Sequence, residues 1–160
     1  MSAVERTLLL RWIEEGFSKK AWHGPNLRGA IRRVDARQAA WRPARGRHNI
    51  AEIVVHCAYW KYAVRRRIRG DKRGSFEFKG SNWFTLPDRF GIAEWKSYVK
   101  LLDAEHAALM QAVVEAPRRE LCWTKSGYGK DIGPHVFGIA MHDVYHAGQI
   151  QTIKALYKSR

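Results

Sequence analysis

Apolar side chains recur at every third or fourth position in three long stretches of this chain, and this spacing is typical of one face of an α-helix. The stretches cover residues 49–69, 92–114 and 134–157. Helices of about 20 residues are about 30 Å long, and their apolar faces must be buried against one another. The pattern therefore predicts an all-α protein built as a four-helix bundle, with residues 4–17 as the remaining helix and residues 27–34 as a short extra one.

The helix over residues 49–69 has clear start and stop signals. Asn49 precedes Glu52 by three positions, which is the spacing of a capping box. Gly70 follows a basic last turn and is a typical residue just beyond a helix end. The remaining segments indicate connections at residues 35–48, 71–91 and 118–132, with a small hairpin around residues 126–129 as one interpretation of the last. We expect a single domain over residues 1–160.

The chain is strongly basic, with 29 Lys and Arg against 15 Asp and Glu and a net charge of +14. Residues 1–80 hold 19 basic and 7 acidic side chains, whereas residues 81–160 hold 10 and 8. Such a field concentrates anions. One interpretation is a nucleic-acid-binding module, favoured by the seven arginines between Arg28 and Arg47, although no recognition motif accompanies them. The other interpretation is a solvated basic surface.

Cysteine usage and hydropathy exclude several classes of protein. Cys57 and Cys122 are the only cysteines, and they form neither a disulfide framework nor a CxxC motif. No apolar run reaches the roughly 18 residues of a membrane span, and no signal-peptide core is visible at the N-terminus. We therefore expect a soluble cytoplasmic protein.

Three histidines occupy core-facing positions. His142 and His146 are four residues apart, so both rings lie on one face of the last helix, and that face is apolar. His56 lies in the middle of an earlier core helix, beside Trp60. Buried imidazoles need partners. Three neutral imidazoles are a ligand set for a divalent metal ion such as zinc, nickel, copper or iron. The alternative is three separate core histidines, each hydrogen-bonded to a backbone or tyrosine group.

Residues 48–60 have the sequence HNIAEIVVHCAYW, and residues 142–150 have the sequence HDVYHAGQI. The first segment resembles the second helix of DinB-like (YfiT-like) proteins, and the second segment resembles their last helix. The likeness covers essentially the whole chain, and residues 21–25 (AWHGP) and 41–43 (WRP) add to it. The resemblance implies an up-down-down-up four-helix bundle, often dimeric, that binds one divalent metal ion, nickel or zinc, through three ligands: His56, His142 and His146.

The resemblance also implies a class of chemistry, because relatives in this superfamily include transferases and isomerases that use low-molecular-weight thiols such as bacillithiol, mycothiol or glutathione. An ion with three neutral ligands keeps its full charge and can hold a bound thiol deprotonated. We therefore expect a metal-dependent thiol transferase or isomerase acting on a small anionic or electrophilic substrate. The alternatives are the nucleic-acid-binding module and a bundle with a purely structural metal. Candidates to hold the carboxylates of the thiol are Arg42, Arg45, Arg47 and the arginines at 65–67.

Further side chains are candidates for the pocket or its surroundings, with core packing as the alternative: Trp60, Tyr145, Gln149 and His106. A metal-bound imidazole needs an acceptor for its other N–H, and Gln149 and Asp143 are the candidates next to the ligands. Asp143 faces another helix, so a salt bridge across the bundle to an arginine is expected of it. Cys57 is interpreted as a small core residue. The other histidines are placed near helix starts: His23, His48 and His135.

Overall fold

The computed structural model describes residues 3–74, 76–117, 121 and 132–160, and this part of the chain contains six helices and no strand. The helices are α1 (Ala3–Phe17), α2 (Leu27–Ile31), α3 (Ala36–Ala40), α4 (Ile50–Arg69), α5 (Ile92–Glu115) and α6 (Ile132–Lys158). The predicted all-α class is confirmed. None of these helices has the length and apolar content that a membrane span requires. The hairpin predicted around residues 126–129 lies outside the described residues.

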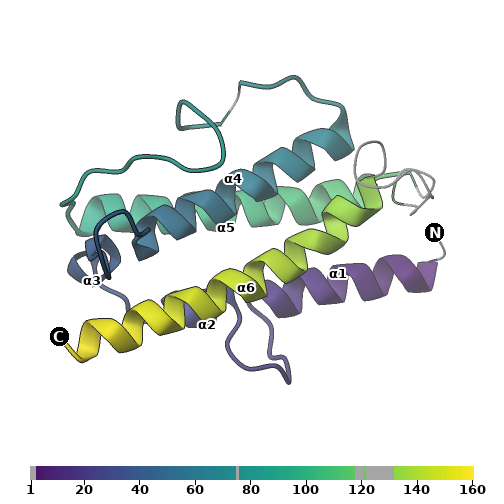
Figure 1. The fold of residues 1–160 in the computed structure, drawn as a ribbon. Helices are drawn as coiled ribbons and strands as arrows, with labels where there is room; N and C mark the ends of the chain where they lie inside the picture. Colours follow the sequence, from purple (N-terminus) through teal and green to yellow (C-terminus); the bar gives the residue numbers. More distant parts are fainter. Residues whose placement is uncertain (1–2, 75, 118–120, 122–131) are drawn as a thin grey trace.

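The four long helices are arranged up-down-down-up (Figure 1). α1 and α6 run in one direction, and α4 and α5 run in the opposite direction. α4 packs mainly against α5 and α6, while α1 packs against α6. Because α4 and α5 are parallel, the chain must return along the length of the bundle between them. Residues 70–91 make this crossover beside α4 (Figure 1), so the long connection predicted at residues 71–91 is a requirement of the topology.

The ends of α4 follow the signals in its sequence. The Asn49 side chain accepts a hydrogen bond from the backbone N–H of Glu52 (2.8 Å), and the Glu52 carboxylate accepts one from the N–H of Asn49 (3.3 Å). This is the predicted capping box. At the other end, Gly70 adopts the left-handed conformation (φ 72°), which costs a glycine little.

The region between α1 and α4 differs from the prediction. The helix expected over residues 27–34 ends at Ile31, and α3 lies within the stretch expected to be a loop. The break has a local cause, because Arg33 adopts a positive φ of 62°. Asp35 then begins a new helix, since its side chain accepts a hydrogen bond from the backbone N–H of Gln38 (2.8 Å). Pro25 lies just before the N-cap residue Asn26.

The core surrounds the first half of α4, where residues 50–58 are all buried. α5 and α6 cover this helix together with α3 and the crossover, which contributes Phe84 and Leu86. A second apolar cluster fills the other end of the bundle. α1 and α6 approach closely at Gly16, where a Cβ atom would lie 2.9 Å from the carbonyl oxygen of Ala140. The arrangement leaves the middle of α4 facing the middle of α6.

Candidate metal centre

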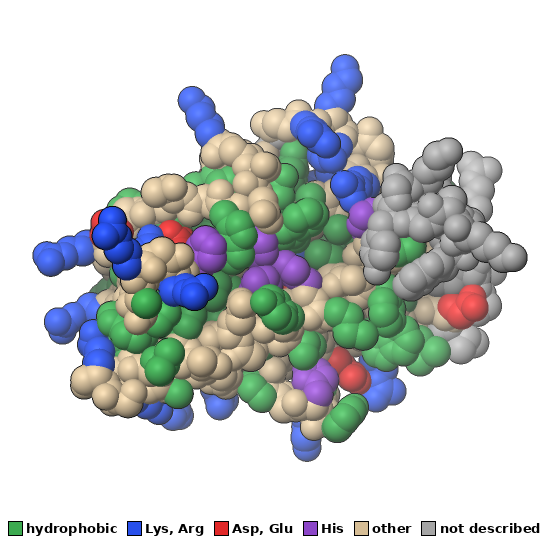
Figure 2. All heavy atoms as spheres, in the orientation of Figure 1, with side chains coloured by type: hydrophobic (Ala, Val, Ile, Leu, Met, Phe, Trp, Pro, Cys, Tyr) green, Lys and Arg blue, Asp and Glu red, His purple; other side chains and the backbone are tan. Residues whose placement is uncertain are grey.

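Three histidines meet where α4 faces α6. His56 comes from α4, and His142 and His146 come from successive turns of α6. The Nε2 atom of His142 lies 3.0 Å from Nε2 of His56 and 3.1 Å from Nε2 of His146. Two of the rings are buried and that of His142 is half-buried. Figure 2 shows histidine side chains gathered in the middle of one face, bordered by hydrophobic side chains, so the cluster is reached from the surface.

Hydrogen bonds on the far side of two rings decide where their protons lie. Nδ1–H of His56 donates to the backbone carbonyl of Asn82 (2.8 Å). Nδ1–H of His146 donates to Oε1 of Gln149 (2.7 Å), and the amide of Gln149 is oriented by its own donation to the hydroxyl of Tyr145 (2.9 Å). A neutral imidazole carries one N–H. The Nε2 atoms of His56 and His146 therefore both present lone pairs to the cluster.

Burial is the main cause that lowers the pKa of all three imidazoles. The pKa of His56 falls to about 4 and that of His142 to about 2. The pKa of His146 is also lowered by burial, although its hydrogen bond to Gln149 acts in the opposite direction. Each ring is therefore neutral near pH 7, which is the form of imidazole that binds a metal ion.

The donor set fits a metal ion better than a hydrogen-bonded cluster. Two lone pairs point at Nε2 of His142, which can donate at most one proton. Neighbouring nitrogens bound to an ion about 2.1 Å away lie roughly 3.0–3.4 Å apart. The two observed separations, 3.0 and 3.1 Å, are of this size. Among the described residues, His56, His142 and His146 thus form a group with the spacing of metal ligands.

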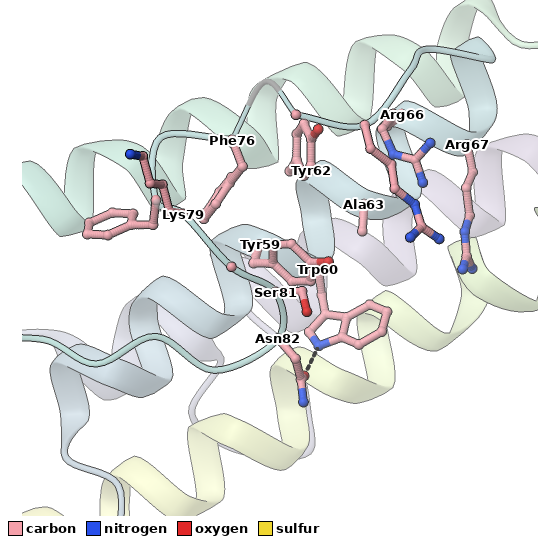
Figure 3. A pocket seen from close by; sticks show the side chains of 14 residues that line it. Tyr59, Trp60, Tyr62, Ala63, Arg66, Arg67, Phe76, Lys79, Ser81 and Asn82 are labelled. Carbon is pink, nitrogen blue, oxygen red and sulfur yellow. Dashed lines mark hydrogen bonds between the residues drawn. The ribbon is translucent and has the colours of Figure 1, made fainter.

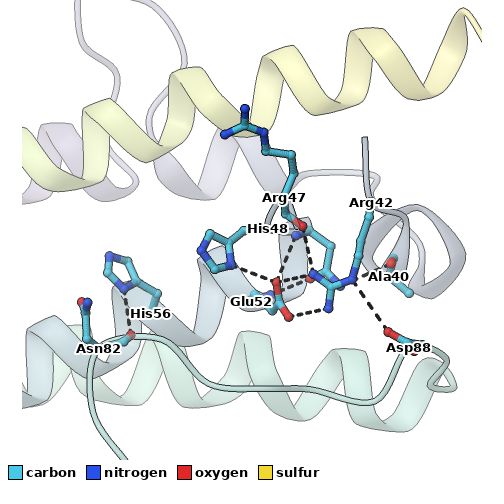
Figure 4. Close-up of polar contacts among 9 residues, drawn as sticks. Ala40, Arg42, Arg47, His48, Glu52, His56, Asn82 and Asp88 are labelled. Atoms are coloured by element: carbon cyan, nitrogen blue, oxygen red, sulfur yellow. Dashed lines mark hydrogen bonds and ion pairs between the residues drawn. The ribbon is translucent and has the colours of Figure 1, made fainter. Parts of the chain in front are cut away.

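An aromatic stack covers one side of His56. Trp83 lies between His56 and His48, with ring centroids 3.8 and 3.6 Å apart and nearly parallel planes. Nδ1 of His48 lies 3.1 Å from the carboxylate of Glu52, which also accepts two hydrogen bonds from Arg42 (2.6 and 2.8 Å; Figure 4). The capping glutamate of α4 is thereby connected through His48 and Trp83 to His56, and this arrangement restricts the imidazole.

A pocket of about 420 Å³ opens beside the three histidines. Its size lies within the usual range of small-molecule sites, roughly 300–1,000 Å³. The walls are mainly apolar and include Trp60, Trp83, Ile139 and Tyr145. A molecule of modest size can therefore reach the cluster from solvent.

Comparison with known protein families matches residues 21–150 to the DinB superfamily, and the matched range includes all three histidines. The chain belongs to the DinB superfamily. Its helical-bundle architecture agrees with this assignment. No curated protein and no solved structure shows a significant match to the chain.

Most of the other predicted residues of this DinB-superfamily chain lie around the pocket. Trp60 and Tyr145 are in its walls, and His135 also lines it. Gln149 lies behind His146 as its hydrogen-bond acceptor. His106 lies elsewhere, outside the candidate ligand group. Its ring stacks on Phe17 at 3.6 Å and lies 3.2 Å from Glu14.

A second group of potential ligands joins Cys57, His142 and Asp143, whose candidate atoms lie within 4.8 Å of one another. This group is poorly suited to a metal. Burial raises the pKa of the Cys57 thiol well above its usual value, so the thiol stays protonated. The Asp143 carboxylate is already engaged by the ammonium of Lys61, with both side chains fully buried. The salt bridge expected across the bundle is thus present, but its partner is a lysine and not an arginine.

The sequence prediction did not identify two residues of the crossover. Asn82 accepts a hydrogen bond from His56 through its backbone carbonyl and one from Nε1–H of Trp60 through its side chain (2.9 Å). It does so from a left-handed conformation (φ 66°), which asparagine tolerates better than most residues. Trp83 supplies the stack described above. The only signal in the sequence was the length of the crossover and its aromatic content.

Proposed function

We propose that this protein is a metal-dependent transferase or isomerase that activates a low-molecular-weight thiol at a divalent ion held by His56, His142 and His146. The proposal depends on one observation. The Nε2 lone pairs of His56 and His146 both point at Nε2 of His142, and each is fixed by a hydrogen bond from Nδ1–H on the far side of its ring. Nickel and zinc are the ions that we propose. The thiol and the class of reaction rest on membership of the DinB superfamily.

The environment of the cluster favours a catalytic role for the ion over a structural one. Structural zinc sites are closed by four protein ligands, whereas catalytic sites keep a position for water or substrate. In the described part of the chain, no fourth His, Cys, Asp or Glu joins the group formed by the three histidines. The neighbouring space is a pocket open to solvent. An exogenous thiol could therefore reach an ion held by these three residues.

When bound, the ion supplies Lewis-acid chemistry that holds a thiol as its thiolate at neutral pH. In the reaction we propose, the sulfur forms a bond to an electrophilic carbon of the substrate, and a leaving group departs with its bonding electron pair. The chain contributes orientation and exclusion of water. Asn82 and Gln149 fix the rings of His56 and His146, while Trp60 and Trp83 wall the pocket.

Tyr145 has a further role in this proposal. Its hydroxyl oxygen accepts a hydrogen bond from Nε2 of Gln149, which leaves its own O–H proton available for donation. Because Tyr145 lines the pocket, this proton can be donated to the charge that develops on the leaving group.

Metal analysis by mass spectrometry on protein purified without a histidine tag tests the metal centre. We expect about one nickel or zinc ion per chain in the wild type and none in His146→Ala. His23→Ala is the matched control, since it removes an exposed histidine from a surface turn. Absence of metal from the wild type after reconstitution with both ions would refute the metal centre.

A separate assay tests the reaction. Metal-loaded protein is incubated with 1-chloro-2,4-dinitrobenzene and glutathione, mycothiol or bacillithiol in turn, and loss of free thiol is followed. We expect turnover with at least one thiol that His56→Ala abolishes. If the protein binds metal but consumes none of the three thiols faster than buffer does, the metal centre stands and the proposed reaction class is wrong.

A further inference from the structure

A second and larger cavity, of about 680 Å³, lies between α4 and residues 73, 74 and 76–82 of the crossover. Figure 3 shows its lining side chains reaching in from both elements. The cavity does not contain the three histidines, and of its lining residues only Trp60 and Asn82 have a role in the reaction proposed above. Its lining nevertheless has a definite chemical character, because basic and aromatic side chains dominate it.

The charge of this cavity has one sign. Among the described residues, its charged lining consists of Arg66, Arg67, Arg73 and Lys79, without an acidic side chain. None of the four forms an ion pair with a carboxylate in the described part of the chain. Arg66 donates to the backbone carbonyl of Asp71 (2.9 Å), and Arg67 lies 2.9 Å from a ring nitrogen of His135. Each guanidinium still has donors left for a ligand, because arginine carries five.

Two of the other arginines considered from the sequence form ion pairs with acidic side chains. Arg42 forms a two-pronged ion pair with Glu52. Arg65, next to the cavity residues in sequence, binds Glu105 of α5 at 3.0 and 3.3 Å. Unlike Arg42 and Arg65, the four basic side chains of this cavity have no carboxylate partner in the described part of the chain.

Aromatic side chains form a further part of the lining. Tyr59 and Tyr62, one turn apart on α4, both pack against Phe76 of the crossover, with ring centroids 5.4 and 5.3 Å apart. Phe78 continues this wall toward Lys79. Flat apolar surfaces of this kind bind an aromatic or extended apolar body, while the basic side chains bind its charged end.

The cavity borders the metal pocket through a single side chain. Trp60 lines both, and its indole N–H is held by the side chain of Asn82 (Figure 3). The Trp60 ring centroid lies 6.4 Å from that of His56 and 6.3 Å from that of His142. A ligand that fills the cavity therefore ends against the wall of the metal pocket.

We infer that the cavity between α4 and the crossover binds a small organic anion, with a carboxylate or phosphate at Arg66, Arg67, Arg73 and Lys79 and an apolar body against Tyr59, Tyr62 and Phe76. If the proposed function is correct, on which this step rests, the anion is the part of the substrate or thiol that does not react. It then holds the reactive end of that molecule beside Trp60.

Phenyl phosphate is a suitable probe because it combines an anion with an aromatic body. Its binding is measured by isothermal titration calorimetry at low ionic strength, where surface charge is least screened. Inorganic phosphate and phenol are the comparisons, since each lacks one of the two features. We expect phenyl phosphate to bind more tightly than either. Equal affinity for phenyl phosphate and inorganic phosphate would overturn the inference.

Variants separate a built site from diffuse surface charge. Arg73→Gln/Lys79→Gln should weaken phenyl phosphate binding about tenfold, since two charged contacts are lost. Lys20→Gln/Arg37→Gln, which removes the same charge from exposed positions elsewhere, should change it by less than about twofold. An equal loss in both variants would identify diffuse charge and refute the site.

The same measurement distinguishes this inference from the proposed metal centre. His146→Ala should bind phenyl phosphate as the wild type does, because the cavity does not include that residue. If no metal binds to the wild type but the anion still does, the proposed function fails and the anion site stands. In the metal-loaded wild type, phenyl phosphate should raise the KM of thiol transfer. No change in KM would refute the link between cavity and reaction.

Discussion

The buried ion pair between Lys61 and Asp143 offers the most direct test of how α4 and α6 are held together. Both side chains are fully buried, and they join the two helices that carry the histidines. The ammonium of Lys61 also lies 5.0 Å from the centre of the Phe17 ring of α1. Burial raises the pKa of Asp143, while Lys61 acts to lower it, so the carboxylate depends on this partner to remain charged.

Removal of one partner leaves the other side chain buried without compensation, either as a charge or as a neutral polar group. Such losses cost about 3–5 kcal/mol, a large share of the roughly 5–15 kcal/mol by which a domain is stable. Lys61→Met and Asp143→Leu should each lose about this much free energy of unfolding. Replacing both residues removes the uncompensated charge and leaves only packing changes of about 1–3 kcal/mol. The double variant should therefore be more stable than either single variant.

Urea unfolding of the four proteins, followed by circular dichroism in the presence of a chelator, gives the coupling energy without a contribution from bound metal. We expect a coupling of at least about 3 kcal/mol between the two sites. If a single variant does not fold, the double variant still should. Losses below about 1 kcal/mol in both single variants, or a double variant whose loss equals their sum, would refute this account of the pair.

Three further predictions test the surroundings of the site and the helix packing. Gln149→Ala should lower the affinity for nickel or zinc about 10- to 100-fold, because the N–H of His146 loses its acceptor. Direct metal titration measures this affinity, and an unchanged value would show that Gln149 does not support His146 as a ligand. Gly16→Ala should destabilise the fold by about 1–3 kcal/mol, since its Cβ would lie 2.9 Å from the carbonyl oxygen of Ala140. Gly148→Ala on α6, with open space around its Cβ, should stabilise the fold by about 0.5–1 kcal/mol. Equal shifts of the thermal unfolding midpoint in the two variants would contradict the close approach of α1 and α6. Burial alone would raise the pKa of Glu52, but hydrogen bonds from Arg42, His48 and Asn49 outweigh it and leave the pKa lowered. The stability from these contacts is therefore fully present above the pKa of Glu52 in the unfolded state, and it is lost as the pH falls through the pKa in the folded state. Glu52→Gln should thus flatten the acid limb of a curve of unfolding free energy against pH.

The sequence was most informative where structure depends on neighbouring residues. The start of α4 at Asn49 and its end at Gly70 follow from hydrogen bonds within a few positions of the helix ends, so both could be predicted. The same holds for His142 and His146, whose shared face is set by helical geometry. The break between α2 and α3 also has a local cause. Asp35 is an N-cap residue and marks the start of α3, although residues 35–48 were predicted to be a loop.

The sequence did not predict contacts that depend on how distant segments pack. Lysine is almost never fully buried, so nothing in the sequence marked Lys61 as the partner of Asp143. Asn82 and Trp83 contact the histidine cluster only because the crossover between two parallel helices passes beside His56. Likewise, Arg66 and Arg73 share a cavity only because the crossover folds back over α4.

The sequence by itself determined the four long helices, the ends of α4 and the three inward histidines, because apolar periodicity, caps and i,i+4 spacing act over a few residues. The tertiary structure decided which nitrogen of each ring faces the cluster, which cations have no carboxylate partner and what walls the pocket. Those properties depend on atoms from distant segments such as α4 and α6, in which His56 and His142 are 86 positions apart in the chain. The free energy of that packing is shared among many contacts that no local pattern encodes.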